Sequence, residues 1–416
     1  MTPKHIVSIS AQLDASPTPR HLVAFIARQL RESKFVDFSN KSVTDSNSGF
    51  IATGGSIIAW RSGTQTAKNG FRIVGAHTDS PCLRIKPNPE DRKFGFNTLQ
   101  VEIYGSPLLN SWLDRDLGIA GHVVLRSGET KLFCSASPVA RISQLAIHLD
   151  REVNERGLVL DKQLHLMPTW SSEKDAPKFI DWVAKHAKTT SPEIVQIEAQ
   201  LFDTAKAAVL GADSSLLASS CLDNQASCWA AISALLESTS ADATQVVALF
   251  DHEEVGSESA TGAAGPVLEH TLEQIAASQK IPRVGFIESL RKSTCISADN
   301  AHAVHHNYPD RHDIANAPII NQGPALKLNS NQRYATSTQS AAMFVTACNR
   351  AKVKQQMFVS RNNMPCGSTI GPITATRLGI DTVDVGVPQL SMHSAREVCG
   401  VDDLLSLKLA LKAYFN

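Results

Sequence analysis

Residues 246–257 are Val246-Val247-Ala248-Leu249-Phe250-Asp251-His252-Glu253-Glu254-Val255-Gly256-Ser257. A continuous apolar run that ends in polar residues predicts a strand buried on both faces, as in a parallel sheet covered by helices. Ligand sites of such sheets lie at the carboxyl ends of the strands. Adjacent carboxylates repel each other unless a cation or a shared proton intervenes. Glu253 and Glu254 therefore mark a candidate metal site, and a solvated loop after the strand is the alternative.

Two further apolar runs end in metal-ligating types of side chain. Residues 71–77 predict a strand that presents His77 and Asp79 at its carboxyl end. Two residues apart on extended chain, these side chains point to the same side. A histidine ligand usually has a carboxylate that fixes its tautomer, and Asp79 is placed for that role. Residues 293–298 predict another strand, which Asp299 follows.

Asp223 and His393 complete a set of candidate ligands. Asp223 precedes a predicted helix over residues 225–237, where an ordinary N-cap is the alternative role, and His393 follows a predicted strand over residues 381–388. Two histidines and three carboxylates hold two metals if one carboxylate bridges them. Such nitrogen and oxygen ligands without thiolate are typical of catalytic zinc, manganese or cobalt. The spare glutamate is then a candidate general base toward a water whose pKa the metal lowers, which predicts hydrolysis of an amide or ester.

The composition excludes several classes of protein. The 416 residues contain 40 lysines and arginines and 40 aspartates and glutamates, so the chain has no basic surplus for nucleic acid or an anionic membrane. The eight scattered cysteines form no C-x-x-C pair, which favours reduced thiols over disulfides or a zinc–thiolate site. Because the N-terminus also lacks an apolar signal core, we expect a cytoplasmic protein.

Hydrophobic patterning divides the chain into two domains. Helical spacing over residues 6–33 is interrupted at Ser16-Pro17-Thr18-Pro19, where Thr18 is a candidate N-cap. Between about 90 and 220 the pattern changes to alternating strands, with a hairpin over residues 121–134 and a short helix over 176–187. We therefore expect an α/β catalytic domain formed by residues 1–90 and 220–416, with a β-rich domain inserted at 91–219. An amphipathic helix over residues 401–415 closes the chain.

The sequence resembles the aspartyl aminopeptidases, dinuclear zinc peptidases that remove acidic N-terminal residues, over nearly its whole length. The matching stretches are Ser16–Pro19, Gly75–Pro81, Trp112–Leu117, Asp251–Ser257, Ala301–His305, Asn331–Thr336, Cys366–Pro372 and Met392–Ser394. The resemblance implies a mixed, mostly parallel sheet flanked by helices, with an inserted β-rich dimerisation domain. It also implies two zinc ions per subunit and dimers that assemble into a tetrahedral dodecamer.

The resemblance also assigns roles to residues of this chain. His77 and Asp299 would hold one metal, Glu254 and His393 the other, and Asp223 would bridge them. Glu253 would be the general base and Asp79 would orient His77. His148, which the residue pattern alone presents as structural, would enter the active site of a neighbouring subunit and stabilise the oxyanion. Lys327 would face the acidic side chain of the substrate, and His302 and Tyr334 would lie on the substrate side.

The sequence departs from the family pattern at two loop positions. His306 replaces a proline and Asn363 replaces an aspartate, and both changes affect the expected substrate-side loops rather than the ligands. The alternative functions are a neutral-residue aminopeptidase or a deacylase on the same dinuclear site. A non-catalytic assembly particle is a further alternative, against which the intact ligand set and Glu253 argue.

Overall fold

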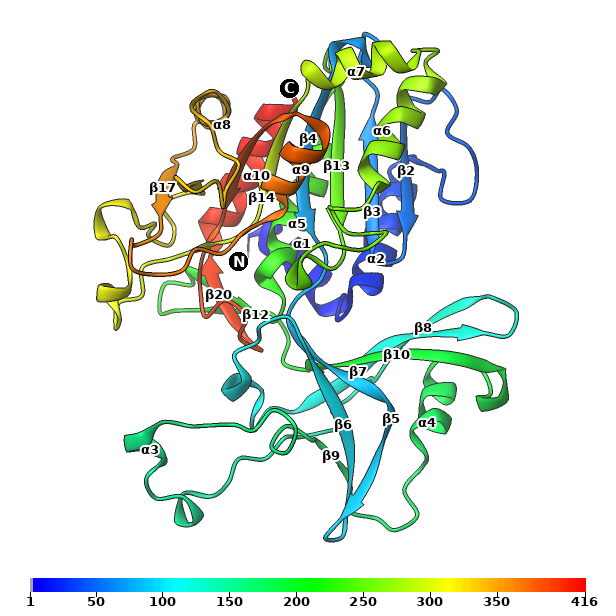
Figure 1. The fold of residues 1–416 in the computed structure, drawn as a ribbon, viewed down its shortest axis with the longest axis vertical. Helices are drawn as coiled ribbons and strands as arrows, with labels where there is room; N and C mark the ends of the chain where they lie inside the picture. Colours follow the sequence, from blue (N-terminus) through cyan, green and yellow to red (C-terminus); the bar gives the residue numbers. More distant parts are fainter. Residues whose placement is uncertain (1–2) are drawn as a thin grey trace.

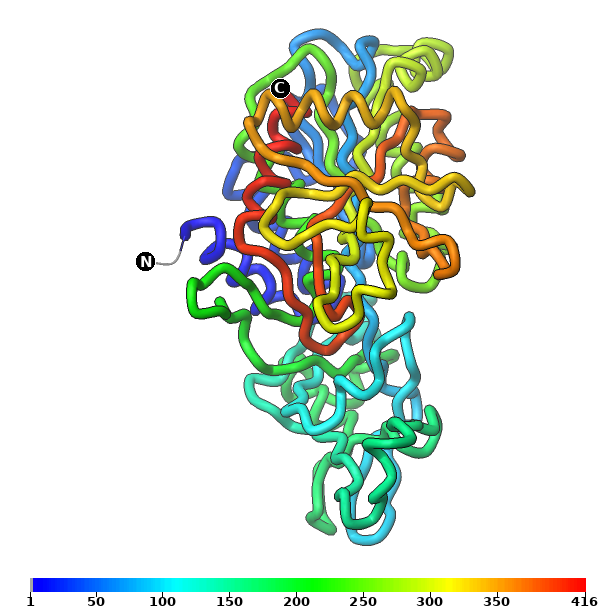
Figure 2. The backbone as a smooth tube through the Cα atoms, turned by 90° about the vertical axis from the view of Figure 1, so that its left-hand side faces the viewer, coloured from blue at the N-terminus to red at the C-terminus, as the bar shows by residue number. Residues whose placement is uncertain are grey.

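The computed structural model describes residues 3–416, and they form a large upper lobe and a smaller lower lobe (Figure 1). The view turned by 90° shows the same division along the long axis (Figure 2). We define the small lobe as Cys82–Asp203, the span of its six-stranded sheet, and the large lobe as the rest. The predicted domain boundaries at residues 90/91 and 219/220 stay predictions.

A nine-stranded mixed sheet forms the centre of the large lobe. Its strand order is β1 (Val36–Asp37), β2 (Ser48–Thr53), β3 (Ser56–Arg61), β13 (Thr244–Phe250), β4 (Phe71–His77), β14 (Thr294–Ala298), β18 (Asp381–Gly386), β16 (Ala325–Leu328) and β17 (Gln356–Val359). The four central strands β13, β4, β14 and β18 are parallel, whereas β3 and β16 run antiparallel to their neighbours β13 and β18. The expected mixed, mostly parallel α/β fold is thus confirmed.

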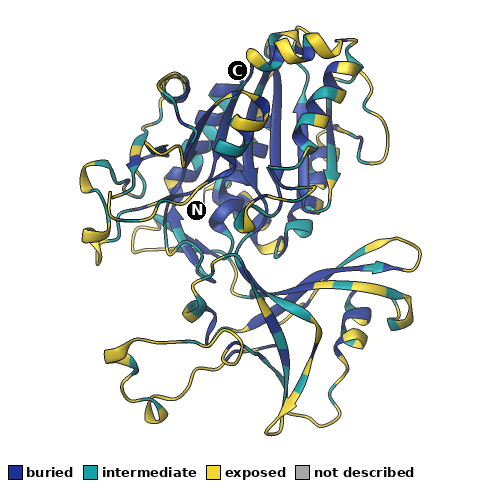
Figure 3. Cartoon of the chain, viewed as in Figure 1, coloured by how far each residue is buried: buried dark blue, intermediate teal, exposed yellow. Residues whose placement is uncertain are grey.

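Helices cover both faces of this sheet. The helices of residues 3–416 are α1 (Lys4–Ala15), α2 (Pro19–Glu32), α3 (Val153–Arg156), α4 (Phe179–His186), α5 (Leu222–Glu237), α6 (Val267–Ser278), α7 (Arg283–Arg291), α8 (Thr338–Ala351), α9 (Ile370–Leu378) and α10 (Val401–Phe415). One hydrophobic core joins α1, α2, α5, α8 and α10 to one face, and another joins α6, α7 and α9 to the other. Figure 3 shows the central strands buried between them.

The sequence of β13 is a continuous apolar run because both faces of the strand are buried. Val247 and Leu249 pack into the core that contains α5 and α10, whereas Val246, Ala248 and Phe250 pack into the core that contains α6 and α9. Successive side chains of a strand point to opposite faces, so both sets must be apolar when both faces are covered.

Other sequence predictions are confirmed at the level of single elements. The predicted break within residues 6–33 separates α1 from α2, and the Thr18 hydroxyl accepts a hydrogen bond from the N–H of His21 as an N-cap. The predicted hairpin is formed by β7 (Leu117–Leu125) and β8 (Thr130–Cys134). All eight cysteines are free. Among residues 3–416, no helix has both the length and the apolarity needed to cross a membrane.

The small lobe contains a six-stranded antiparallel sheet with its own hydrophobic core. Its strand order is β8, β7, β10 (Ile194–Asp203), β5 (Cys82–Lys93), β6 (Phe96–Tyr104) and β9 (Thr169–Ser171). A third sheet lies near the junction of the lobes, in the order β11 (Ala208–Leu210), β12 (Leu216–Ser219), β20 (Glu397–Gly400), β19 (Pro388–Leu390) and β15 (Ala301–His302). Strand β5 begins at this junction and β6 ends there, close to the carboxyl edge of the large sheet (Figure 1).

Candidate metal centre

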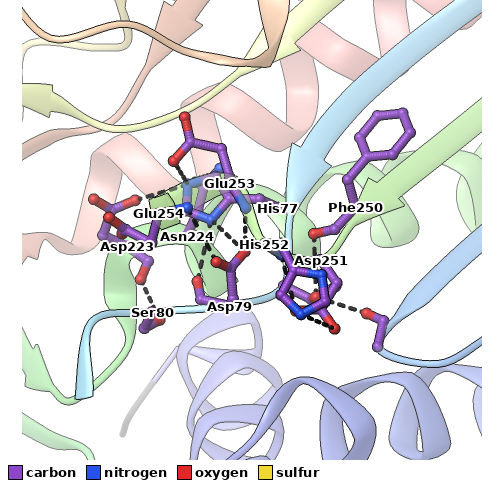
Figure 4. A network of polar contacts seen from close by, with 12 residues as sticks. His77, Asp79, Ser80, Asp223, Asn224, Phe250, Asp251, His252, Glu253 and Glu254 are labelled. Carbon is purple, nitrogen blue, oxygen red and sulfur yellow. Dashed lines mark hydrogen bonds and ion pairs between the residues drawn. The ribbon is translucent and has the colours of Figure 1, made fainter. Parts of the chain in front are cut away.

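The carboxyl ends of three neighbouring parallel strands bring the candidate ligands together. His77 is the last residue of β4, which lies between β13 and β14, and its register partner on β13 is Phe250. Glu253 and Glu254 follow β13 in the short helix η5 (Glu253–Val255), and Asp299 follows β14 directly. The close view shows the side chains of His77, Glu253, Glu254 and Asp223 gathered at this edge (Figure 4).

One group of side chains surrounds the Nε2 atom of His77. This atom lies 3.4 Å from Oδ1 of Asp223, 3.8 Å from Oδ1 of Asp299 and 3.9 Å from Oε2 of Glu253. His77, Asp223 and Asp299 are all buried. Each offers one ligand atom, and these atoms lie within 4.8 Å of one another.

A second group surrounds the Nε2 atom of His393. It lies 3.4 Å from Oε2 of Glu254 and 3.6 Å from Oδ2 of Asp223. Asp223 thus directs one carboxylate oxygen toward each histidine. A carboxylate between two ligand groups has the arrangement that a bridging ligand requires.

Asp79 lies behind His77 and is bonded to the loop that carries both glutamates. The Nδ1 atom of His77 is 3.1 Å from the main-chain oxygen of Asp79 and 3.5 Å from its Oδ1. The Asp79 carboxylate also accepts hydrogen bonds from the main-chain N–H groups of Glu253 and Glu254, each at 3.1 Å. One buried carboxylate therefore fixes both the histidine ring and the start of η5.

The electrostatics of the cluster favour a bound cation. Burial is the main cause that raises the pKa of Glu253 to about 8 and that of Glu254 well above its usual value; neighbouring carboxylates raise both further, and the nearby histidines oppose this. Burial opposes charge on His77 and His393, yet the surrounding carboxylates raise the pKa of His77 well above its usual value and that of His393 to about 10. Protons are thus held where negative charge is in excess, and a divalent cation replaces them in a metal site.

Two buried oxygens in the cluster lack a hydrogen-bond partner within the described residues, Oδ1 of Asp223 and Oε1 of Glu254. Buried polar atoms are nearly always partnered, so each such atom requires an explanation. Both belong to ligand groups of imidazole nitrogen and carboxylate oxygen without thiolate. This donor set fits zinc in a catalytic setting.

The N-cap alternative for Asp223 is wrong. The residue before α5 is Cys221, whose φ is 57°, and Asp223 itself has a non-helical backbone. Its N–H donates to Oε2 of Glu397 at 3.0 Å, while its side chain points toward the two histidines. The turn at Cys221 therefore directs Asp223 into the cluster instead of onto the helix end.

Sequence reasoning missed Glu397, which lies on β20 and is 2 % exposed. Its Oε2 accepts the N–H of Asp223 and its Oε1 accepts the N–H of His393 at 2.7 Å. One carboxylate thereby links the main chains of two candidate ligands that lie far apart in sequence. The tripeptide Arg-Glu-Val around it carries no signal, since its role depends on the pairing of β20 with β12 at Ser219.

The remaining predicted site residues lie at different distances from the cluster. Lys327 is 2 % exposed, and its Nζ is 3.6 Å from Oδ2 of Asp299 and 5.2 Å from the ring centroid of buried Tyr334. His302 is exposed on β15, with its ring 6.0 Å from that of Phe358. His148 is exposed on η3 (Ile147–Leu149) in the small lobe, outside the ligand groups of residues 3–416.

Comparison with known proteins identifies relatives of the whole chain. The model of the family described as aminopeptidase I zinc metalloprotease (M18) matches residues 12–415. A probable M18 family aminopeptidase 2 of Streptomyces coelicolor is 44 % identical, over 99 % of this chain and 98 % of the relative. The structure of Ape4 in its complex with Nbr1 has a TM-score of 0.94 at 34 % identity, over 99 % of this chain and 85 % of that one. The mApe1 dodecamer of Saccharomyces cerevisiae has a TM-score of 0.85 at 27 % identity, over 99 % and 96 %.

The fold, the histidine and carboxylate cluster and these matches define a metal-dependent hydrolase of peptide bonds. The chain belongs to the M18 family of zinc aminopeptidases. The resemblance to zinc metallo-aminopeptidases is thereby confirmed, and the family membership argues against the deacylase and the non-catalytic particle.

Proposed function

We propose that this protein removes N-terminal aspartate or glutamate from peptides and binds two zinc ions per subunit. His77 and Asp299 would hold one ion, Glu254 and His393 the other, and Asp223 would be shared between them. The observation that supports this assignment is the position of Asp223, whose two oxygens lie 3.4 and 3.6 Å from the two histidine Nε2 atoms. Manganese and cobalt accept the same nitrogen and oxygen ligands.

The chain's own residues supply the proton transfer. When bound, zinc would supply Lewis-acid chemistry, lowering the pKa of a water from about 15.7 toward roughly 7. Glu253 takes a proton from the attacking water and delivers it to the leaving amine, because it is the glutamate of the pair that is not needed as a ligand. Asp79 holds the His77 ring and the main chain of Glu253 in place.

Lys327 supports the acidic preference. It is a buried ammonium beside the cluster, and buried lysines are rare unless they are paired. A substrate carboxylate that pairs with Lys327 forms a partly desolvated charge pair, for which truncation of one partner costs about 2–4 kcal/mol. Tyr334, which the Lys327 ammonium faces, forms the wall of the same subsite, and His302 lies at its exposed rim.

A neutral-residue aminopeptidase is the second candidate, and one distance favours it. Nζ of Lys327 lies 3.6 Å from Oδ2 of Asp299, so the ammonium already has a carboxylate partner. If Lys327 only neutralises Asp299, it provides no charge for the substrate. The two functions then differ in the substrate profile, not in the metal centre.

The test compares kcat/KM for aspartyl, glutamyl and leucyl peptides on the zinc-loaded protein and on Lys327→Met. We expect this variant to lose about 30- to 700-fold on the acidic peptides, which corresponds to about 2–4 kcal/mol, and little on leucyl peptides. Lys408→Met is the matched control, because Lys408 is also a paired lysine, 2.9 Å from Glu237 and outside the cluster. Equal losses on all three peptides would instead assign Lys327 to Asp299.

We also propose that two copies pair through their small lobes and that His148 of the partner subunit stabilises the oxyanion. His148 is flanked by exposed apolar side chains, Leu145, Ile147 and Leu149, which suit burial in a subunit contact. The related mApe1 forms a dodecamer, and we propose the same assembly for this chain. His306 and Asn363 are both exposed on loops of the large lobe, where they are free to alter peptide preference.

A further inference from the structure

A short segment of the small lobe reaches the metal centre of the large lobe. Tyr104 is the last residue of β6, and its hydroxyl donates a hydrogen bond to Oδ2 of Asp79 at 2.7 Å. Both side chains are buried, and the guanidinium of Arg84 lies 3.9 Å from the Tyr104 ring centroid. The Asp79 carboxylate, which orients His77 and the glutamate loop, is therefore held from behind by the small lobe.

The residues after Tyr104 contact the opposite side of the cluster. The main-chain oxygen of Ser106 accepts a hydrogen bond from Nδ1 of His393 at 3.0 Å, and the N–H of Leu108 donates to the oxygen of His393 at 2.9 Å. With its proton on Nδ1, the imidazole keeps the Nε2 lone pair for the cluster. The small lobe thus sets the tautomer of His393, and through Asp79 it also helps to orient His77.

Gly105 allows this approach. Its φ is 68°, in the region that favours glycine, and a Cβ added there would lie 3.2 Å from the Cβ of Glu254. Residues 104–108 therefore pass against Asp79, Glu254 and His393 in succession. Figure 1 shows β6 rising from the small lobe to this point below the large sheet.

We propose that Tyr104–Leu108 is a positioning element of the metal centre, through which the small lobe sets the affinity for zinc. The proposal rests on the ligand assignment made above. Groups that hydrogen-bond to metal ligands fix the ring orientation and basicity of those ligands, and their loss typically lowers metal affinity about 10- to 100-fold.

Zinc affinity of the full-length protein, measured by competition with a chelator, tests the proposal. We expect Tyr104→Phe to bind zinc about 10- to 100-fold more weakly than the parent. Tyr414→Phe is the matched control: Tyr414 is equally buried at 8 %, and its hydroxyl bonds to the oxygen of Thr294 and the N–H of Ile73, away from the cluster. A merely structural role lowers the melting temperature of both metal-free variants but leaves their zinc affinity equal.

A second pair of variants tests the position of the segment's main chain and removes no side-chain hydrogen bond. Gly105→Ala and Gly95→Ala both place a Cβ on a positive φ, at 68° and 87°, but only the first approaches another side chain. We expect weaker zinc binding in Gly105→Ala alone. The proposal is overturned if Tyr104→Phe retains the parent affinity, or if each variant and its control lose zinc equally. Because no peptide enters this assay, failure of the acidic preference leaves its outcome unaffected.

Discussion

Three glutamates that follow β13 are expected to differ in their contributions to proton transfer and metal binding. Oε2 of Glu254 is 3.4 Å from Nε2 of His393, whereas Oε2 of Glu253 is 3.9 Å from Nε2 of His77. Glu258, on the same loop, is exposed. Replacing each glutamate by glutamine preserves the shape of the side chain and removes its charge. Differences among the three variants therefore report the role of the carboxylate that each one lacks.

The expected results follow from these positions. Glu253→Gln leaves the main-chain bond from residue 253 to Asp79 in place, so zinc affinity stays within about threefold of the parent while kcat falls about 10²- to 10⁴-fold, the usual contribution of a general base. That loss corresponds to about 2.7–5.5 kcal/mol in the barrier. Glu254→Gln removes a charged ligand, so zinc affinity falls and added zinc partly restores activity. Glu258→Gln changes neither quantity.

Two measurements decide between the roles. Zinc affinity is obtained by chelator competition, and kcat by turnover of an aspartyl peptide at saturating zinc. A Glu253→Gln enzyme within about tenfold of the parent kcat would refute the assignment of Glu253 as base. A Glu253→Gln enzyme that loses zinc as Glu254→Gln does would make Glu253 a ligand, a role that the grouping of His77, Glu253 and Glu254 also permits.

Two further predictions concern Glu397 and His148. Glu397→Gln should weaken zinc binding about 10- to 100-fold. The control is Asp403→Asn, because the Asp403 carboxylate likewise accepts two main-chain N–H groups, those of Asn321 and Gly323; this variant should lower only the melting temperature. Equal zinc affinity in the two variants would contradict a positioning role for Glu397. His148→Ala and Glu253→Gln subunits, each nearly inactive alone, should regain activity when they are co-assembled. In a mixed pair, one active site then has an intact Glu253 and receives an intact His148 from the other subunit. Mixed assemblies with no recovery of activity would show that His148 does not act across a subunit contact.

The sequence predicted the central strands because their signal is local. An apolar run such as Val246–Phe250 specifies a strand with two covered faces wherever it lies in the chain. Parallel neighbours then place their polar ends at one edge, so the sequence could predict that His77, Glu254 and Asp299 lie together there without knowledge of contacts. The capping role of Thr18 could also be predicted, because it depends on a contact within one turn, with the N–H of His21.

The parts that sequence reasoning missed depend on contacts between distant segments. Tyr104 ends an alternating strand and has the pattern of a core residue, and Glu397 lies in no motif. Their partners Asp79 and Asp223 are set by how the small lobe and the third sheet dock onto the large sheet. An N-cap remained the alternative for the candidate ligand Asp223 because its position before a helix is local, whereas the turn that redirects it, with a φ of 57° at Cys221, has no residue-type signal.

The outer and inner carboxylates of the cluster differ in their hydrogen-bond partners. Asp79 and Glu397, the outer carboxylates, each accept two main-chain N–H groups, and Asp79 accepts the Tyr104 hydroxyl in addition. Such donors stabilise a buried carboxylate without adding a competing cation. The inner oxygens Oδ1 of Asp223 and Oε1 of Glu254 have no partner among the described residues. Backbone amides therefore satisfy the outer carboxylates Asp79 and Glu397, whereas these two inner oxygens are left for the metal that we propose. The small lobe and β20 thus contribute hydrogen bonds to a site that the large sheet carries.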